Sequence, residues 1–212
     1  SCVVDSWYMP ARSVVFVTDG SYHVYNRGSE KRSIFQSDRD YKKFLHRTKE
    51  NAQKFSITIL CYCLMPNHFH FLLQQTSDLP ITAFMNAVQL GHAKFFNTKY
   101  ERIGPLYQSR FKAKPVISDE YLLQLSAYIH KNPIASLFDS RNPSDSRNLL
   151  DRLHAYPYSS YREYLGFESK PLSKPDTILA YFSQTQPKLS YQAFVENFIP
   201  DLEALTPLLA HE

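Results

Sequence analysis

Two histidines one residue apart are the side chains in this sequence best suited to chemistry. His68 and His70 follow the turn-forming residues Met65-Pro66-Asn67 and open an apolar, aromatic stretch typical of a β-strand. Because alternate side chains of a strand point to the same face, the two imidazoles project together, about 7 Å apart along the backbone. Their ring nitrogens can converge on one metal ion, although two packed or surface histidines in a strand would show the same spacing.

A second candidate is a tyrosine on a helix predicted over 118–131, which Pro133 is expected to end. Helical spacing places Tyr121 and Tyr128 on one face, and Asn132 lies on that face four residues beyond Tyr128. The alternative is a buried tyrosine followed by an asparagine that only terminates the helix.

Length and composition indicate an ordinary globular protein. The chain has 212 residues, is 43% hydrophobic and carries a formal net charge of +4. No apolar run approaches the ~20 residues needed to cross a bilayer, so we expect no membrane partner. Three cysteines do not make a disulfide framework. The sequence therefore predicts a cytoplasmic protein whose mildly basic charge permits nucleic-acid binding.

The hydrophobic pattern predicts an α+β fold. We expect strands over 14–26, 55–63, 68–75 and 107–116, and helices over 37–54, 79–100 and 118–131. This β-α-β-β-α-β order is the ferredoxin-like plan, an antiparallel sheet with packed helices.

The domain organisation follows from the same pattern. We expect a first domain over 1–138, a polar linker loop over 139–148 and a C-terminal helical extension over 149–212 that packs on the core. Short helices are predicted in that extension over 159–165, 175–182 and 190–198.

Six short blocks of the sequence together resemble the REP-associated tyrosine transposases, which belong to the HUH single-tyrosine transposases that act on single-stranded DNA. The resemblance covers about residues 14–166. In chain order the blocks are Tyr22–Gly28, Tyr62–His70, Gly104–Lys112, Glu120–Leu123, Tyr128–Pro133 and Tyr158–Tyr161.

This resemblance implies a single-stranded DNA endonuclease and strand transferase that cleaves next to REP-type hairpins. Tyr128 matches the nucleophile, which forms a 5′-phosphotyrosine and leaves a free 3′-OH. His68 and His70 match the ligands of a divalent cation, Mg²⁺ or Mn²⁺. Asn132 matches a third ligand that is often Gln in relatives, and Asn is shorter by one methylene. The HUH nuclease fold, a monomer or homodimer, and a bacterial, nucleoid-associated location are implied as well.

Four basic residues are candidates for DNA contacts. Arg110, Lys112 and Lys114 alternate along the predicted strand over 107–116, and Arg27 lies in the first block. Such cations contact phosphates, although a solvated charged face is the alternative for any one of them.

Three other interpretations stay open. A relaxase or replication-initiator-like nickase shares the histidine pair and the tyrosine. A non-catalytic, RRM-like domain shares the ferredoxin-like plan. A structural zinc site is a third possibility, because a two-residue turn would place Cys63, with Cys61 nearby, opposite His70.

Overall fold

The computed structural model describes residues 14–135 and 146–198. Its centre is a four-stranded sheet with the strand order β2-β3-β1-β4, in which every neighbouring pair is antiparallel. The strands are β1 (Ser21–Arg27), β2 (Ile57–Met65), β3 (His68–Gln75) and β4 (Lys112–Pro115). This strand order and the β-α-β-β-α-β sequence of elements confirm the predicted ferredoxin-like, α+β fold.

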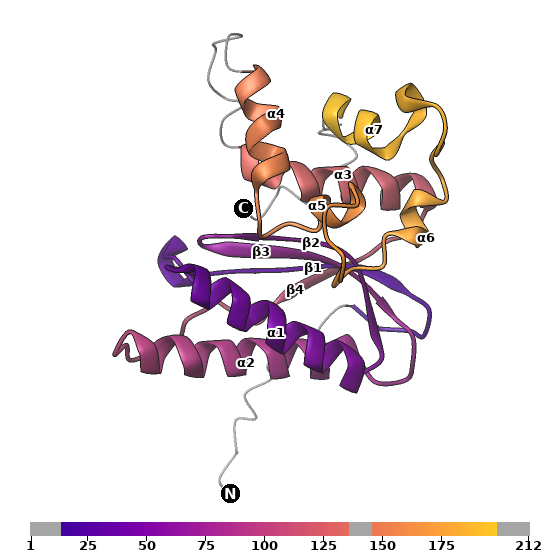
Figure 1. The fold of residues 1–212 in the computed structure, drawn as a ribbon. Helices are drawn as coiled ribbons and strands as arrows, with labels where there is room; N and C mark the ends of the chain where they lie inside the picture. The colour runs from indigo at the N-terminus through magenta and orange to yellow at the C-terminus, as the bar shows by residue number, and fades with distance from the viewer. Residues whose placement is uncertain (1–13, 136–145, 199–212) are drawn as a thin grey trace, which may run out of the picture.

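Helices cover both faces of this sheet (Figure 1). Helices α1 (Asp38–Lys54) and α2 (Ile81–Lys99) lie against one face, and α3 (Asp119–Ala135) lies against the other. The strands supply both layers because their side chains alternate. Phe69 and Phe71 of β3 belong to the core under α1 and α2, whereas Leu72 belongs to the core under α3.

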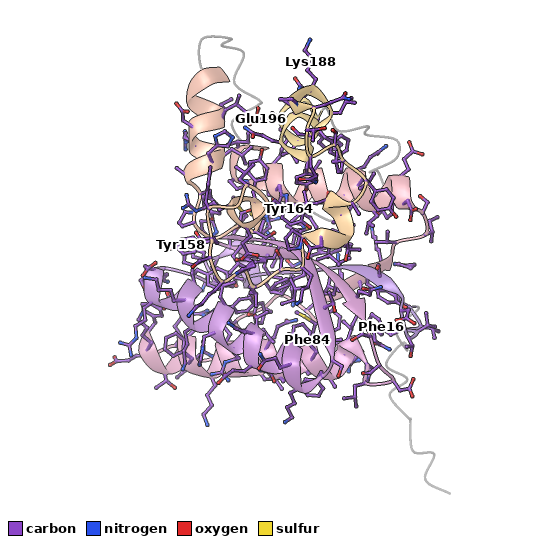
Figure 2. All side chains as sticks on the ribbon, turned by 45° about the vertical axis from the view of Figure 1, so that its right-hand side comes forward. Phe16, Phe84, Tyr158, Tyr164, Lys188 and Glu196 are labelled. Carbon is purple, nitrogen blue, oxygen red and sulfur yellow. The ribbon has the colours of Figure 1, made fainter. Side chains whose placement is uncertain are left out.

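The C-terminal segments extend the layer that contains α3. They comprise α4 (Ser146–Ala155), α5 (Tyr161–Tyr164), α6 (Asp176–Leu179) and α7 (Tyr191–Asn197), with the short 3-10 turn η3 (Pro187–Leu189) before α7. Figure 2 shows Phe84 in the lower helical layer and Tyr164 in the upper one. Apolar side chains of these segments share a single core with α3 and β2.

The predicted linker over 139–148 lies outside the described residues as far as 145, and α4 already begins at Ser146. The division into a domain, a linker and an extension stays a prediction. Among the described residues no helix combines the length and the apolarity that a bilayer span requires.

Three predicted element boundaries are wrong. Strand β1 begins at Ser21 rather than at residue 14, because a turn with Asp19 at a φ of 62° precedes it. Strand β4 covers only Lys112–Pro115. Helix α3 continues through Pro133 to Ala135. A proline so near the helix end removes few backbone hydrogen bonds, and continuing the helix keeps Ile134 fully buried.

Candidate active site

The histidine pair opens β3 on the face that α3 covers. The hairpin pairs Met65 with His68 across the turn, as the sequence predicts. The rings of His68 and His70 lie with their centroids 5.1 Å apart and their planes at 89°. His70 is buried and His68 is half-buried. The period of two therefore brings both imidazoles to one place on the sheet.

Helix α3 brings Tyr128 and Asn132 to the same place. The Tyr128 ring stands edge-on to the His70 ring, with centroids 5.8 Å apart. The Asn132 Oδ1 lies 3.2 Å from the Nε2 of His68. Tyr128 and Asn132 are 8% and 7% exposed, so both face inward. The structure thus assembles all four residues that the sequence singled out for catalysis and metal binding.

A neighbouring asparagine decides which nitrogen of His68 carries its proton. The Nδ1 of His68 lies 2.7 Å from the Oδ1 of Asn67, and the amide nitrogen of Asn67 donates to the carbonyl of Lys31. This second bond turns the oxygen of Asn67, which can only accept, toward His68. In neutral His68 the Nε2 then carries a lone pair that faces the oxygen of Asn132. A cation or a proton between these two acceptors would satisfy both of them.

These donor atoms fit a divalent cation. Ligand bonds of about 2.0–2.2 Å at right angles place two ligand atoms about 3 Å apart, close to the 3.2 Å between His68 Nε2 and Asn132 Oδ1. Within the described residues, no group of three or more His, Cys, Asp or Glu could hold a metal ion. A site here therefore depends on the Asn132 amide as its third protein donor, and two imidazoles with one amide suit Mn²⁺ better than Mg²⁺.

His23 of β1 lies directly behind the pair and was missed by sequence reasoning. Its Nε2 is 2.9 Å from the Nδ1 of His70, and the two rings are nearly parallel with centroids 5.1 Å apart. Burial, with a smaller effect of the Lys114 charge, lowers the pKa of His23 to about 3. Burial likewise holds the pKa of His70 well below its usual value, with smaller effects of His23 and His68. The available signal was the alternation of His23 and Tyr25 on one strand.

A second tyrosine on α3 lies further from the histidines. Tyr121 is half-buried, and its pKa is raised by burial and by the neighbouring Tyr25. Tyr128, by contrast, contacts the His70 ring itself. Of these two tyrosines, Tyr128 is therefore the one that lies beside the histidine pair.

Helix α3 is held in its setting by the residues that follow Tyr128. His130 bonds to the Ser160 hydroxyl through Nε2 and to the Tyr191 hydroxyl through Nδ1, both at 2.8 Å. Lys131 donates to the carbonyl of Phe198 at 2.9 Å, beyond the end of α7. His130 follows Tyr128 by two residues and so lies about 200° round the helix from it, pointing away from the histidine pair. These hydrogen bonds to the C-terminal segments, together with packing against β2, form a clamp that holds the helix carrying Tyr128.

Three of the four predicted DNA-binding cations lie on the strands next to the histidines, and the fourth does not. Arg27 is the direct cross-strand neighbour of His68, and Lys112 is that of Tyr25. Lys114 pairs with His23 one step further along. The expectation that Arg110 shares this strand face is wrong: it lies exposed in the loop before β4 begins.

A small cavity adjoins the histidine pair. Its volume is about 70 Å³, and it is lined by Tyr25, Asn26, Arg27, His68, Phe69, His70, Gln108 and Lys112. Two of the predicted DNA-binding cations, Arg27 and Lys112, therefore share a cavity with both histidines. An anionic group beside the metal ligands would meet positive charge there.

Within the described residues the cysteines belong to no group that could hold zinc, the third possibility named above. Cys63 does pair with His70 across β2 and β3, as the register argument expects. Burial raises the pKa of Cys61 and of Cys63 far above the usual value, so both are protonated thiols when no metal is bound. The Sγ of Cys63 lies 3.8 Å from the sulfur of Met65. Both cysteines belong to the core under α3.

Comparison with solved structures reveals the same fold elsewhere. The structure of a REP-associated tyrosine transposase bound to a REP hairpin superposes with a TM-score of 0.57 at 13% identity, covering 86% of this chain and 97% of the other. A candidate transposase from Deinococcus radiodurans R1 gives a TM-score of 0.40 at 17% identity, covering 56% and 93%. No curated protein sequence matches the chain.

Sequence comparison identifies the family. The family described as "Transposase IS200 like" matches residues 16–132, which is more than half of the chain. The match runs from the segment before β1 to Asn132 and so includes His68, His70 and Tyr128. With the ferredoxin-like fold and the assembled site described above, this match shows that the chain belongs to the family of IS200-like transposases.

Proposed function

We propose that this transposase is a single-stranded DNA endonuclease and strand transferase that cleaves beside REP-type hairpins. The observation that carries the proposal is the position of Tyr128, whose ring stands against His70 while Asn132 of the same helix reaches His68. A nucleophile and a metal-binding pair that share one small site suit phosphoryl transfer.

In the proposed reaction the phenolic oxygen of Tyr128 attacks the scissile phosphorus. A bond forms between phosphorus and the tyrosine oxygen, and the bond from phosphorus to the 3′-oxygen breaks. The phenol proton is lost to solvent, and the departing 3′-oxygen takes up a proton. The product is a 5′-phosphotyrosine with a free 3′-OH, and an incoming 3′-OH reverses the step to join a new strand. The covalent bond conserves the free energy needed for that joining.

The side chains around Tyr128 have separable tasks. His68, His70 and Asn132 would hold a Mg²⁺ or Mn²⁺ ion, which when bound polarises a phosphate oxygen. Arg27 and Lys112 line the adjoining cavity and would attract the phosphate backbone. The clamp around His130 keeps Tyr128 in place without touching the substrate.

The choice of a hairpin substrate is supported by the shared fold. The solved relative with this fold was bound to a REP hairpin. The six sequence blocks also resemble those of REP-associated enzymes. The proposed partner is therefore single-stranded DNA that carries such a hairpin.

A covalent-adduct assay tests the proposal, with the two tyrosines of α3 as a matched pair. Wild-type protein, Tyr128→Phe and Tyr121→Phe are each incubated with a labelled hairpin oligonucleotide and Mn²⁺. We expect a denaturant-stable adduct with wild type and Tyr121→Phe, and none with Tyr128→Phe, because that change removes only the nucleophilic oxygen. Hairpin binding by Tyr128→Phe should stay within a few-fold of wild type.

Other outcomes identify the alternatives. An adduct that persists in Tyr128→Phe and disappears in Tyr121→Phe would move the nucleophile to Tyr121. Binding of the hairpin by wild type without any adduct or cleavage would indicate a non-catalytic binding domain. Nicking of single strands that lack a hairpin would favour a relaxase-like activity.

A further inference from the structure

His23 is a fully buried histidine to which the proposed reaction assigns no task. It lies on β1, on the sheet face that carries the metal-binding pair, with its Nε2 2.9 Å from the Nδ1 of His70. The two rings are nearly parallel, at 10°, and His23 is 1% exposed. One nitrogen of each ring is therefore committed to the other ring, away from water.

One proton is shared in the hydrogen bond between His23 and His70. The nitrogen that carries this proton decides whether the Nε2 of His70 can bind a metal ion. Both rings are neutral because burial disfavours the charged form, so each carries one proton. If the shared proton belongs to the Nδ1 of His70, the Nε2 of His70 holds a lone pair and can bind a metal. If it belongs to the Nε2 of His23, the Nε2 of His70 is protonated and cannot.

The other histidine of the pair shows which arrangement suits the site. The Nδ1 of His68 is engaged by the oxygen of Asn67, which leaves Nε2 to face Asn132. Metal-bound histidines generally donate their remaining ring N–H to an acceptor, which sets the tautomer and raises the basicity of the ligand. His23 occupies, behind His70, the position that Asn67 occupies beside His68.

We infer that His23 is a positioning residue whose Nε2 accepts the Nδ1 proton of His70 and so presents the Nε2 of His70 to the divalent cation. This inference rests on the proposed function in one respect, the assignment of His70 as a ligand. Within the part of the chain that the structure describes, the Nδ1 of His23 has no hydrogen-bond partner. The tautomer of His23 is therefore set by its bond to His70 alone.

Mn²⁺ binding to the DNA-free protein, followed by electron paramagnetic resonance, tests this inference. His23→Phe keeps a ring of similar size but removes the acceptor. His23→Gln places an amide oxygen near the original Nε2. His92→Phe serves as the matched control, because His92 is a fully buried histidine of α2, which lies against the other face of the sheet.

We expect His23→Phe to weaken Mn²⁺ binding by about 10–100-fold, the usual loss when a residue that orients a metal ligand is removed. His23→Gln and His92→Phe should stay within about three-fold of wild type. Equal affinity in His23→Phe and wild type would overturn the inference. An equal loss in His23→Gln would overturn it too, since the ring rather than the acceptor would then matter.

A second measurement needs no variant. Nitrogen-15 NMR of the imidazoles in Mg²⁺-loaded wild-type protein should place the proton of the shared bond on the Nδ1 of His70. Finding that proton on the Nε2 of His23 would overturn the inference. The adduct assay separates the two proposals: an adduct-forming wild type that binds Mn²⁺ as tightly as His23→Phe retains its proposed function and loses only this role for His23.

Discussion

The two faces of the sheet bury histidines in opposite ways. Under α1 and α2, His92 bonds through Nε2 to the backbone carbonyl of Ile34 at 2.8 Å and packs against phenylalanine rings. Under α3, His70 bonds to a second histidine, His23. A carbonyl oxygen can only accept, so it fixes the proton of His92 on Nε2, whereas in a bond between two imidazoles either ring can hold the shared proton. Burial alone therefore does not distinguish a structural histidine from a functional one.

The largest expected effect comes from alanine at the functional histidines. His68→Ala or His70→Ala should abolish Mn²⁺-dependent cleavage of a hairpin oligonucleotide while the protein stays folded, because each change removes one of two imidazole ligands. His92→Ala should do the reverse: it should lower the free energy of unfolding by about 2–4 kcal/mol through the cavity and the orphaned carbonyl, yet leave Mn²⁺ affinity unchanged.

Cleavage assays and urea denaturation of the three variants measure both effects. Full Mn²⁺-dependent activity of either His68→Ala or His70→Ala would remove that histidine from the ligand set. A loss of Mn²⁺ affinity in His92→Ala would show that His92, too, contributes to metal binding, so that the two faces would not differ in this way.

The clamp on α3 predicts a pH effect on stability. Burial lowers the pKa of His130 to about 3, against 6.5 in the unfolded chain. Between these values the unfolded chain binds a proton that the folded chain does not. The stability contributed by neutral His130 is thus complete above pH 6.5 and declines as the pH falls toward 3, by about 1.4 kcal/mol per pH unit.

Urea denaturation of wild type and His130→Phe between pH 7 and 4 measures that slope. The variant should be less stable at neutral pH and should show a slope shallower by about 1.4 kcal/mol per pH unit. Parallel curves would indicate that His130 is not neutral in the folded protein.

The cations predict a smaller and salt-dependent contrast. Lys112→Ala should weaken hairpin binding and lower the slope of log affinity against log salt by about one, because it removes one phosphate contact beside the histidines. Arg110→Ala tests the exposed loop before β4 in the same way. Lys94→Ala, on the exposed side of α2, is the control and should leave the slope unchanged.

Fluorescence anisotropy at several salt concentrations gives these slopes. If only Lys94→Ala reduced the slope, the hairpin would lie on the helical face and not beside the histidines. An unchanged slope in Arg110→Ala would make Arg110 an ordinary solvated cation.

The smallest effect is expected at Asn132. Asn132→Ala should cost less Mn²⁺ affinity and cleavage rate than either histidine variant, since water can replace a neutral amide ligand. Asn132→Asp should preserve or tighten Mn²⁺ binding, because a carboxylate adds charge and an oxygen that this ion prefers. Titrating the cleavage rate against Mn²⁺ decides the matter. Superimposable curves for wild type and Asn132→Ala would remove Asn132 from the set of metal ligands.

The periods of strands and helices predicted correctly which side chains share a face, because that depends only on neighbours along the chain. The period of two put His68 and His70 on one face, and the helical period put Tyr128 and Asn132 on another. Local rules failed where a distant contact overrode them. Pro133 does not end α3, because burying Ile134 outweighs one lost hydrogen bond.

The sequence by itself determined the fold class, the histidine pair and the helix that carries the candidate nucleophile. It did so because strand and helix periods are local properties of the chain. Only the tertiary structure decided that His23 lies behind His70 and that Asn132 reaches His68, since β1, β3 and α3 are far apart in sequence. It also decided that Cys63 is a core thiol, because burial is a property of the whole packed chain.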